Sequence, residues 1–288
     1  MQSEKTILVV GGDLRYAYTA RALADKCSVH ALGLMRQLPG VHCADTPGEL
    51  PGCDILVLPM PVSEDGVTVH APYAASPVLL RDLLPLLHPG ALVLGGRFGK
   101  AEDFFRMAGY ETDDYSRREE FALFNAIPTA EGAVGILLDE LPRTLYGASV
   151  LVTGYGRIGR FLAMLLRSFG AEVTVAARRS ADRARAEMNG CRAIPVSALA
   201  EEIGRFDAVC NTVPVCILTA DVLAAMREDA LILDLASKPG GTDREAAQKL
   251  GRRFVWALSL PGRTSPVTAG QTIARTVMQM LAERGLAP

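Results

Sequence analysis

A glycine-rich segment, VLVTGYGRIGRFLA at residues 150–163, carries the clearest chemical signal in the sequence. Its G-x-G-x-x-G spacing lies between a β-branched run and an apolar stretch of helical periodicity. In such a strand–turn–helix, Gly154 allows a tight turn, Gly156 lets the backbone approach a pyrophosphate and Gly159 lets the helix pack closely on the strand. The first N–H groups of the helix then favour the phosphates. The segment predicts a dinucleotide site; the alternative is a glycine-rich turn that binds no nucleotide.

The end of the next predicted strand indicates which dinucleotide binds. An NAD site usually has an Asp or Glu here for the ribose 2′-hydroxyl, whereas this chain has Arg178, Arg179 and Ser180. These side chains can hydrogen-bond a 2′-phosphate, so we expect NADP(H) in preference to NAD(H). The alternative is that both arginines are solvated residues at a helix start. The residues expected to bind the cofactor are Gly154, Tyr155, Gly156, Arg157, Ile158, Ala177, Arg178, Arg179, Ser180, Thr212, Val213, Pro214, Leu235, Ala236 and Ser237.

Two later strand ends carry polar residues that we expect at the same edge of the sheet as the glycine motif. NTVP at residues 211–214 follows one predicted strand, and DLASKPGGT at residues 234–242 follows another. Ligands in open α/β sheets bind outside the carboxyl ends of the strands, so we expect these loops to face the nicotinamide and the substrate. The alternative is that their prolines and glycines only make turns.

The composition indicates a folded protein that acts on small molecules. Hydrophobic residues make up 49% of the 288 residues and charged residues 22%. The net charge of −2 gives no general attraction to nucleic acid or anionic membranes, so we expect neither as a partner. Gly, Pro and charges interrupt every apolar run before it reaches the length of a membrane span, and the first residues lack a secretory pattern. We therefore expect a cytoplasmic protein.

Cysteine and histidine give no sign of a metal site. The 6 cysteines contain no C-x-x-C pair, and the 4 histidines have no metal-ligand spacing. We expect reduced, mostly buried cysteines and no bound metal. Residues 117–288 contain no histidine, which disfavours a 2-hydroxy-acid dehydrogenase with an acid–base histidine.

The elements that must position these loops form two series. Short β-branched runs alternate with helical patterns, starting at residues 6–10 and again at residues 149–153, which is typical of βαβ units. We predict an α/β fold of two Rossmann-like lobes with parallel sheets and a cleft between them. Residues 1–127 form a flavodoxin-like or Rossmann-like lobe, and the C-terminal helix, residues 268–288, packs back on it by analogy with two-lobed dehydrogenases. Residues 128–267 form the NADP(H)-binding Rossmann domain.

The scheme includes three further helices. Residues 76–87 are expected to be helical, and residues 129–141 form a connecting helix with Pro128 suited to its first turn. The final helix covers residues 268–284, after a loop that contains Pro261, Gly262 and the stretch from Ser265 onward.

Several segments together resemble the dipicolinate synthase A subunit family, a protein family of spore-forming bacteria. They run in the family's order over nearly the whole chain, and generic dehydrogenases share the glycine motif but not the blocks IPTAEG and DLASKPGGTD. The matching segments are VGGDLR at 10–15, LPMPVSEDG at 58–66, NAIPTAEG at 125–132, the glycine motif, DLASKPGGTD at 234–243 and LPGRTSPVTAGQ at 260–271.

The resemblance implies a concrete reaction. With a flavoprotein-like B subunit, the protein would oxidise dihydrodipicolinate, or its hydroxytetrahydro precursor, to dipicolinate in the mother cell during sporulation. The nicotinamide would accept the hydride, and a homo-oligomer is expected. Two alternatives remain: a dehydrogenase of another small carboxylic acid, and a non-catalytic NADP-binding regulatory subunit.

A substrate with two carboxylates needs cationic or N–H anchors. Lys238 stands where the family often has Arg, so the charge is kept but the planar fork is lost. Glu131, expected in the first turn of the connecting helix, either takes the ring proton or has a structural role, in which it favours the helix dipole or completes a capping arrangement with Thr129. Arg15 either reaches the substrate or is a surface residue, and Thr268 either marks a carboxylate-binding helix N-terminus or caps it. The catalytic candidates are Glu131 and Lys238, and the substrate-binding candidates are Arg15, Thr129, Lys238, Gly240, Gly241, Thr242 and Thr268.

Overall fold

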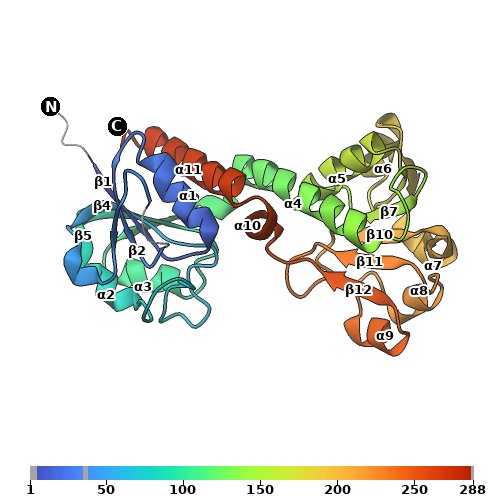
Figure 1. Ribbon diagram of the computed structural model, residues 1–288, viewed down its shortest axis with the longest axis horizontal. Coiled ribbons are helices and arrows are strands. Elements are labelled where there is room, and N and C mark those ends of the chain that lie inside the picture. Colours follow the sequence, from blue (N-terminus) through green and yellow to red (C-terminus); the bar gives the residue numbers. More distant parts are fainter. Residues whose placement is uncertain (1–4, 35–37, 287–288) are drawn as a thin grey trace. The chain divides into compact units, whose positions relative to one another are not determined.

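The computed structural model describes residues 5–34 and 38–286, which form two compact units (Figure 1). Unit 1 comprises Met1–Asn125 and Ser265–Pro288, and unit 2 comprises Ala126–Thr264. We predicted one domain of residues 1–127 with 268–288 and a second of residues 128–267, and this division stays a prediction. Their ends at residues 1–4 and 287–288 lie outside the described residues.

Unit 1 is a parallel six-stranded sheet with the order β3-β2-β1-β4-β5-β6. Alternate side chains of β1 explain its two covering layers, since they point to opposite faces. Ile7 and Val9 pack under α1 and α11, while Leu8 and Val10 pack under α2 and α3. The elements are β1 Thr6–Val10, α1 Leu14–Leu23, β2 Ser28–Leu32, β3 His42–Ala44, β4 Cys53–Val57, α2 Leu80–Leu83, β5 Leu87–Gly95, α3 Ala101–Met107, β6 Glu111–Asp114 and α11 Pro266–Glu283.

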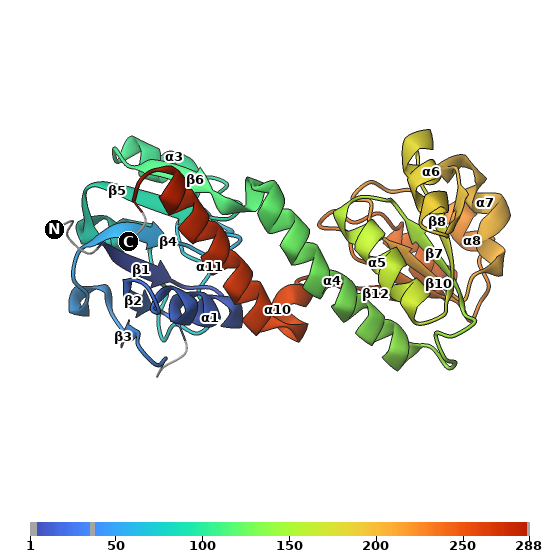
Figure 2. The same ribbon diagram turned by 90° about the horizontal axis from the view of Figure 1, so that it is seen from above.

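The C-terminal helix packs on the first helix of unit 1, which confirms its predicted return to the first lobe (Figure 2). The contact is close because Gly270 has no side chain: a Cβ there would lie 2.4 Å from the Arg15 carbonyl oxygen. Thr19 Oγ1 uses the space to donate to the Gly270 carbonyl at 3.1 Å. The first turn of α11 is thereby fixed beside the first turn of α1.

Unit 2 repeats the architecture with the strand order β12-β11-β10-β7-β8-β9, again all parallel. One face of its sheet packs on α5 and on the connecting helix α4, Glu119–Glu140, and the other carries Leu199, Ile203, Phe206 and Leu223. The elements are β7 Ser149–Thr153, α5 Arg157–Ser168, β8 Glu172–Ala176, α6 Ser180–Met188, β9 Arg192–Ile194, α7 Leu199–Glu202, β10 Ala208–Asn211, α8 Ala220–Ala224, β11 Leu231–Asp234, α9 Arg244–Lys249, β12 Arg253–Trp256 and α10 Leu260–Thr264. The predicted α/β fold with two Rossmann-like parts is confirmed.

The connecting helix is longer than predicted and begins ten residues before the expected start at residue 129. α4 spans Glu119–Glu140 without interruption and contains Pro128 in its interior. A proline removes one backbone hydrogen bond, but the turns on both sides are anchored: Phe121 is buried in unit 1, and Ala133 and Leu137 are buried in unit 2. Burial thus outweighs the local cost of the proline, and Pro128 does not mark a helix start.

The expectation that every apolar run would be interrupted before reaching membrane length was therefore wrong for α4. Within the described residues, α4 is the one helix long and apolar enough to cross a membrane by length and composition. Half of its apolar window is buried inside the protein.

Two further sequence predictions need correction. Residues 76–87 hold only the short helix α2 and a 3-10 turn at Leu84–Leu86, because Pro77 and Pro85 remove backbone donors. The expected loop before the last helix contains α10, and α11 begins at Pro266 with Ser265 as its N-cap residue. Thr268 is therefore the third residue of α11 and does not cap it.

Two buried tyrosines join α1 to the end of β6 in unit 1. The Tyr16 and Tyr115 hydroxyl oxygens are 2.6 Å apart, and the Tyr115 hydroxyl donates to the Leu58 carbonyl at 3.0 Å. The Tyr115 hydrogen is thus committed, so Tyr16 donates to Tyr115. Burial raises the pKa of Tyr16 to about 12, so the pair stays neutral at physiological pH.

Replacing Tyr115 by Phe should therefore lower the free energy of unfolding by about 1–3 kcal/mol, because the Leu58 carbonyl and the Tyr16 hydroxyl lose their buried partner. Urea unfolding followed by circular dichroism measures the change. Tyr73→Phe, at a side chain 45% exposed, is the matched control and should be neutral. Equal stability of both variants would contradict the role given to the pair.

Candidate functional site

The glycine turn between β7 and α5 has the geometry that a dinucleotide site requires. Gly154 adopts φ +86°, and a Cβ on it would lie 2.6 Å from Thr212 Oγ1. A Cβ on Gly159 would lie 2.3 Å from the Gly154 carbonyl oxygen, so the helix start must approach the turn closely. At Gly156, the N-cap residue of α5, a Cβ would meet nothing within 4 Å. Gly154 and Gly159 thus shape the turn, while Gly156 leaves open space over the helix N-terminus.

A buried hydrogen-bond network ties this turn to the ends of β10 and β11. The Thr153 hydroxyl donates to Asn211 Oδ1 at 2.6 Å, and Asn211 Nδ2 donates to Asp234 Oδ1 at 2.8 Å. Thr153 and Asn211 are fully buried and Asp234 is 1% exposed. Because the three residues end three adjacent strands, the network fixes the relative positions of the loops that follow them.

Asp234 also organises the loop that carries Lys238. Its carboxylate accepts from the backbone N–H groups of Ala236 at 3.0 Å and Gly241 at 2.9 Å, and from Thr242 Oγ1 at 2.8 Å. With Asn211 this makes four donors around one buried carboxylate. Four hydrogen bonds compensate for the loss of hydration that burial causes.

These contacts correct the expectation of an N–H-rich anion cradle at Gly240 and Gly241. The Gly241 N–H is bound to Asp234, and the Gly240 N–H donates to the Ser237 carbonyl at 2.9 Å. The Thr242 hydroxyl is committed to Asp234 as well. Lys238 is instead exposed in this loop, so its ammonium can meet a ligand there.

Trp256, the single tryptophan of the chain, supports this loop and was missed by sequence reasoning. Its indole N–H donates to the Ala236 carbonyl at 3.0 Å. A Cβ on Gly240 would lie 3.4 Å from the indole, and the Arg244 guanidinium lies 4.8 Å from the ring centroid. A tryptophan that ends a predicted strand next to a glycine-rich loop was the available signal.

The turn from β8 to α6 carries the arginines expected to recognise a 2′-phosphate. Arg178 and Arg179 are exposed, and no hydrogen bond or ion pair of their side chains is found within the described residues. Arg183 Nη1 donates to the carbonyls of Ala177 and Arg178, both at 2.9 Å, and holds the turn in place. Asp182, the acid of the first turn of α6, is paired with Arg160 and Arg185. The turn thus presents two positive charges that face no acid in the described structure.

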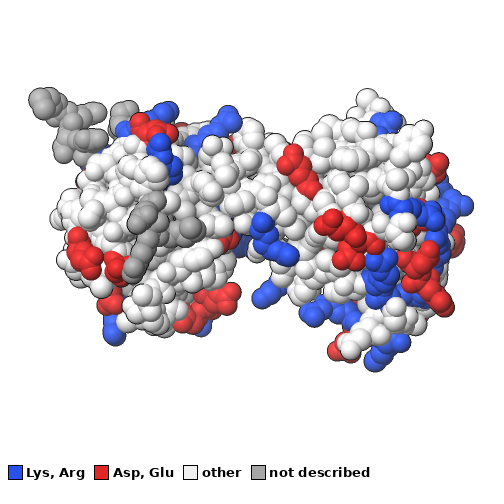
Figure 3. Space-filling view, in the orientation of Figure 1, with Lys and Arg blue, Asp and Glu red and all other residues white. Residues whose placement is uncertain are grey.

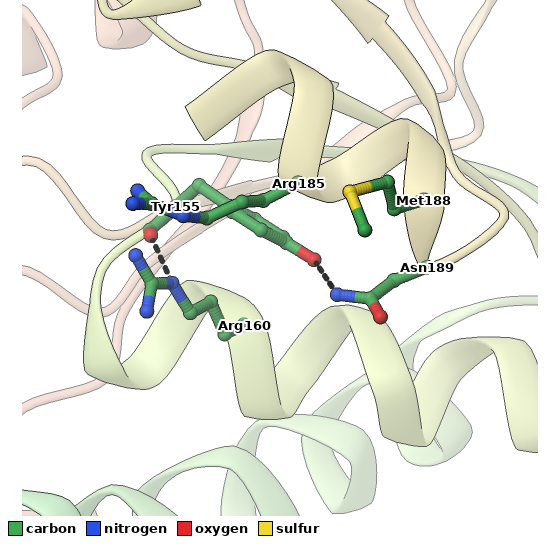
Figure 4. Close-up of a pocket in the computed structure, with 5 residues that line it drawn as sticks. All are labelled: Tyr155, Arg160, Arg185, Met188 and Asn189. Carbon is green, nitrogen blue, oxygen red and sulfur yellow. Dashed lines mark hydrogen bonds between the residues drawn. The ribbon is translucent and has the colours of Figure 1, made fainter. Parts of the chain in front are cut away.

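The side chain of Tyr155 turns away from the phosphate side of the glycine turn. It extends between α5 and α6, where its hydroxyl accepts from Asn189 Nδ2 at 2.9 Å (Figure 4). Arg160 Nε donates to the Tyr155 carbonyl at 2.9 Å, and both residues line a shallow cavity of about 130 Å³. Tyr155 can therefore contact a cofactor through its backbone. Arg157 is exposed and Ile158 half-buried at the start of α5.

Thr129 and Glu131 lie in the middle of α4. Thr129 is 7% exposed, whereas Glu131 is exposed on the helix surface. Since α4 begins at Glu119, Glu131 is in neither the first turn nor a capping arrangement with Thr129, and both structural alternatives are wrong. The expected helix N-terminus near Thr129 is likewise absent.

Arg15 belongs to unit 1, and the structure corrects the alternative that it is a surface arginine. It is 6% exposed, and its Nε and Nη2 each donate to the Asp13 carboxylate at 2.8 Å. Burial acts to raise the pKa of the Asp13 carboxyl, but the hydrogen bonds and charge of Arg15 outweigh it and the pKa lies below its ordinary value. Thr268 lies in unit 1 as well, in the first turn of α11.

The structure thus brings most of the predicted cofactor residues to one edge of the unit 2 sheet. The glycine turn contacts Thr212 and Val213, and Asn211 and Asp234 link it to the loop of Leu235, Ala236 and Ser237.

Four of the six free cysteines are buried, among them Cys210 in β10. Acidic and basic side chains are interspersed on the face shown in Figure 3.

Comparisons with known proteins agree with this geometry. The family model for the N-terminal domain of the dipicolinate synthase A subunit matches residues 6–107, and "D-isomer specific 2-hydroxyacid dehydrogenase, NAD binding domain" matches residues 136–245. The A subunit of dipicolinate synthase from Bacillus subtilis (strain 168) is 32% identical over 284 residues, covering 96% of both chains.

Solved structures are similar as well. The crystal structure of the dipicolinate synthase A subunit from Bacillus halodurans has a TM-score of 0.89 at 29% identity, covering 96% of this chain and 98% of that one. A transhydrogenase from Sinorhizobium meliloti has a TM-score of 0.76 at 18% identity over 98% and 95% of the chains, a likeness of fold. The NAD-binding family match and the glycine turn fall on the same segment, so unit 2 carries an NAD(P)-binding domain.

Two glycine variants separate the cofactor role of the turn from its structural role. Gly156→Ala adds a methyl group into open space, so it should cost at most about 1 kcal/mol of stability, as alanine at an N-cap does. It should weaken NADPH binding at least tenfold, about 1.4 kcal/mol, by blocking the approach of the pyrophosphate. Gly159→Ala collides with the Gly154 carbonyl and should destabilise the fold by about 1–3 kcal/mol.

Thermal unfolding and NADPH titration of both variants provide the measurements. A stable Gly156→Ala variant that binds NADPH like the wild type would contradict the assignment of this turn to the cofactor.

Proposed function

The chain belongs to the family of the dipicolinate synthase A subunit, and on this premise we propose that it oxidises dihydrodipicolinate, or the hydroxytetrahydro precursor, to dipicolinate with NADP⁺. It is an NAD(P)-dependent oxidoreductase. The observation that carries the proposal is the edge of the unit 2 sheet. There the glycine turn, a strand end with arginines and no acid, and an exposed lysine loop follow strands of one parallel sheet.

The cofactor site that we propose follows from this edge. The N-terminus of α5 above Gly156 would hold the pyrophosphate. Arg178, Arg179 and Ser180 would hold the 2′-phosphate, which favours NADP(H) over NAD(H). Thr212, Val213, Pro214 and the loop from Leu235 to Ser237 would line the nicotinamide side.

The reaction removes a hydride and a proton from the ring. The nicotinamide held by unit 2 would supply the hydride acceptor when bound, and the gain of aromaticity would drive the step. The proton leaves to a base, for which Glu131 is our candidate as an exposed carboxylate of α4. Lys238 would bind a ring carboxylate and orient the substrate for transfer. The products are dipicolinate, NADPH and one proton; the hydroxytetrahydro precursor would first lose water.

The cellular setting is proposed from the family. We infer that the partner is a flavoprotein-like B subunit, that the chain forms a homo-oligomer, and that it works in the cytoplasm of the mother cell of a sporulating bacterium. The alternatives are a dehydrogenase of another small carboxylic acid and a non-catalytic NADP-binding regulatory subunit.

A turnover assay tests the reaction. The purified chain, with and without the partner subunit, is incubated with the aldol product of pyruvate and aspartate semialdehyde and either NADP⁺ or NAD⁺. We expect dipicolinate absorbance to rise faster with NADP⁺. Tight NADP(H) binding without dipicolinate under any condition would favour the regulatory alternative.

Cofactor preference should depend on the arginines of the β8–α6 turn. Arg178→Ala should raise the Kd for NADP⁺ about 10- to 100-fold, since it removes charge-assisted hydrogen bonds to the 2′-phosphate. The Kd for NAD⁺ should stay within about twofold. Arg205→Ala, an exposed arginine paired with Glu202, is the control and should change neither value. An equal loss for both cofactors would remove the 2′-phosphate argument.

Lys238 should act on the substrate and not on the fold. Because its side chain is exposed, Lys238→Ala should unfold like the wild type yet lower kcat/KM at least tenfold, about 1.4 kcal/mol. Lys238→Arg keeps the charge and should retain activity. Wild-type kcat/KM in Lys238→Ala would exclude this residue from the substrate site.

A further inference from the structure

A second charged group, at the carboxyl end of β1 in unit 1, has the properties of a binding site. The sheet order β3-β2-β1-β4-β5-β6 reverses direction between β1 and β4, and ligands of open α/β sheets bind outside the carboxyl ends of strands at such a point. Asp13 and Arg15 follow β1 directly at this position, at the start of α1.

The pairing of Asp13 with Arg15 uses only part of the guanidinium. Nε and Nη2 donate to the two carboxylate oxygens, both at 2.8 Å, and Nε also lies 3.1 Å from Oδ2. Within the described residues no acceptor is found for Nη1, and Nη1 is not among the buried side-chain atoms without a partner. Its two N–H groups are thus free and reach the surface of unit 1.

The side chains of the pair make their contacts locally, at the start of α1. The partners of the Arg15 guanidinium are Asp13, two residues before it, and the face of the neighbouring Tyr16 ring at 5.8 Å. Within the described residues, the hydrogen bonds and ion pairs of these two side chains therefore join no distant elements, unlike the Tyr16–Tyr115 pair next to them. Burying the Arg15 side chain so that it is 7% exposed costs desolvation free energy. A pair with a residue only two positions away adds little stability to the tertiary fold in exchange.

Asp13 fixes where the arginine points. It is the N-cap residue of α1, and its Oδ1 accepts from the Arg15 N–H at 3.1 Å as well as from the guanidinium. The backbone on its N-terminal side is held by the Gly12 N–H, which donates to the His70 carbonyl at 2.7 Å. The free edge of the guanidinium is thereby oriented before any ligand arrives, which reduces the entropy lost on binding.

We propose that Asp13 and Arg15 form a preorganised carboxylate-binding site of unit 1, in which Asp13 is the positioning residue and Arg15 Nη1 binds one carboxylate of a pyridine-dicarboxylate ligand. This inference rests on the proposed function for the identity of the ligand. It extends that function by giving one ligand carboxylate an anchor within unit 1.

The test measures binding without turnover. The affinities of the full chain for dipicolinate, with two carboxylates, and for picolinate, with one, are compared by calorimetry in the presence of NADPH. The wild type should bind dipicolinate at least tenfold more tightly. Asp13→Asn keeps an N-cap side chain but loses the charge, so it should lose most of this preference while binding picolinate and NADPH like the wild type. Arg15→Gln should do the same, and Asp13→Glu should restore part of the preference.

Asp25→Asn is the matched control, because the Arg21–Asp25 pair lies at the other end of the same helix and is exposed. It should leave all affinities unchanged. A folded Asp13→Asn or Arg15→Gln variant with the wild-type preference for dipicolinate would overturn the inference, as would equal binding of both ligands by the wild type. A preserved preference without any oxidation would instead contradict the proposed function and leave this site intact.

Discussion

The carboxylate of Asp234 is the contact on which the site depends most. It is removed from water at the end of a central strand and is acceptable there because four donors surround it. One donor comes from β10 and three come from its own loop, so the charge draws together segments that local sequence preference alone would not fix. The Gly154 turn joins the same network through Thr153, the last residue of β7, and Asn211. Loss of this one charge would deprive Asn211 and three donors of the Lys238 loop of the same acceptor.

The prediction succeeded where each residue has a local reason for its place. The glycine spacing, the absence of an acid after β8 and the β-branched runs could be read directly, and the structure has the turn and the strands there. It failed where tertiary burial overrides a local rule. Pro128 is a sound sign of a helix start, yet Phe121 and Leu137 are buried on either side and carry α4 through it.

The donors of the glycine-rich loop show a second kind of limit. The sequence indicates N–H groups at Gly240 and Gly241, but it cannot indicate whether a ligand or the protein receives them. Here Asp234 and the Ser237 carbonyl do. The burial of Arg15 was also invisible, because a polar helix start after a strand has the same pattern whether its arginine faces solvent or the core. Side-chain partners at strand ends depend on loops distant in sequence, and that information is absent from spacing.

The position of Trp256 has a consequence for the fluorescence of the protein. It is the single indole of the chain, it bonds the Ala236 carbonyl, and it packs under the loop that presents Lys238. The tryptophan fluorescence of the protein therefore comes from one place, which is beside the loop expected to line the nicotinamide. The protein carries a built-in fluorophore whose quenching can report the state of the loop in real time, without a label.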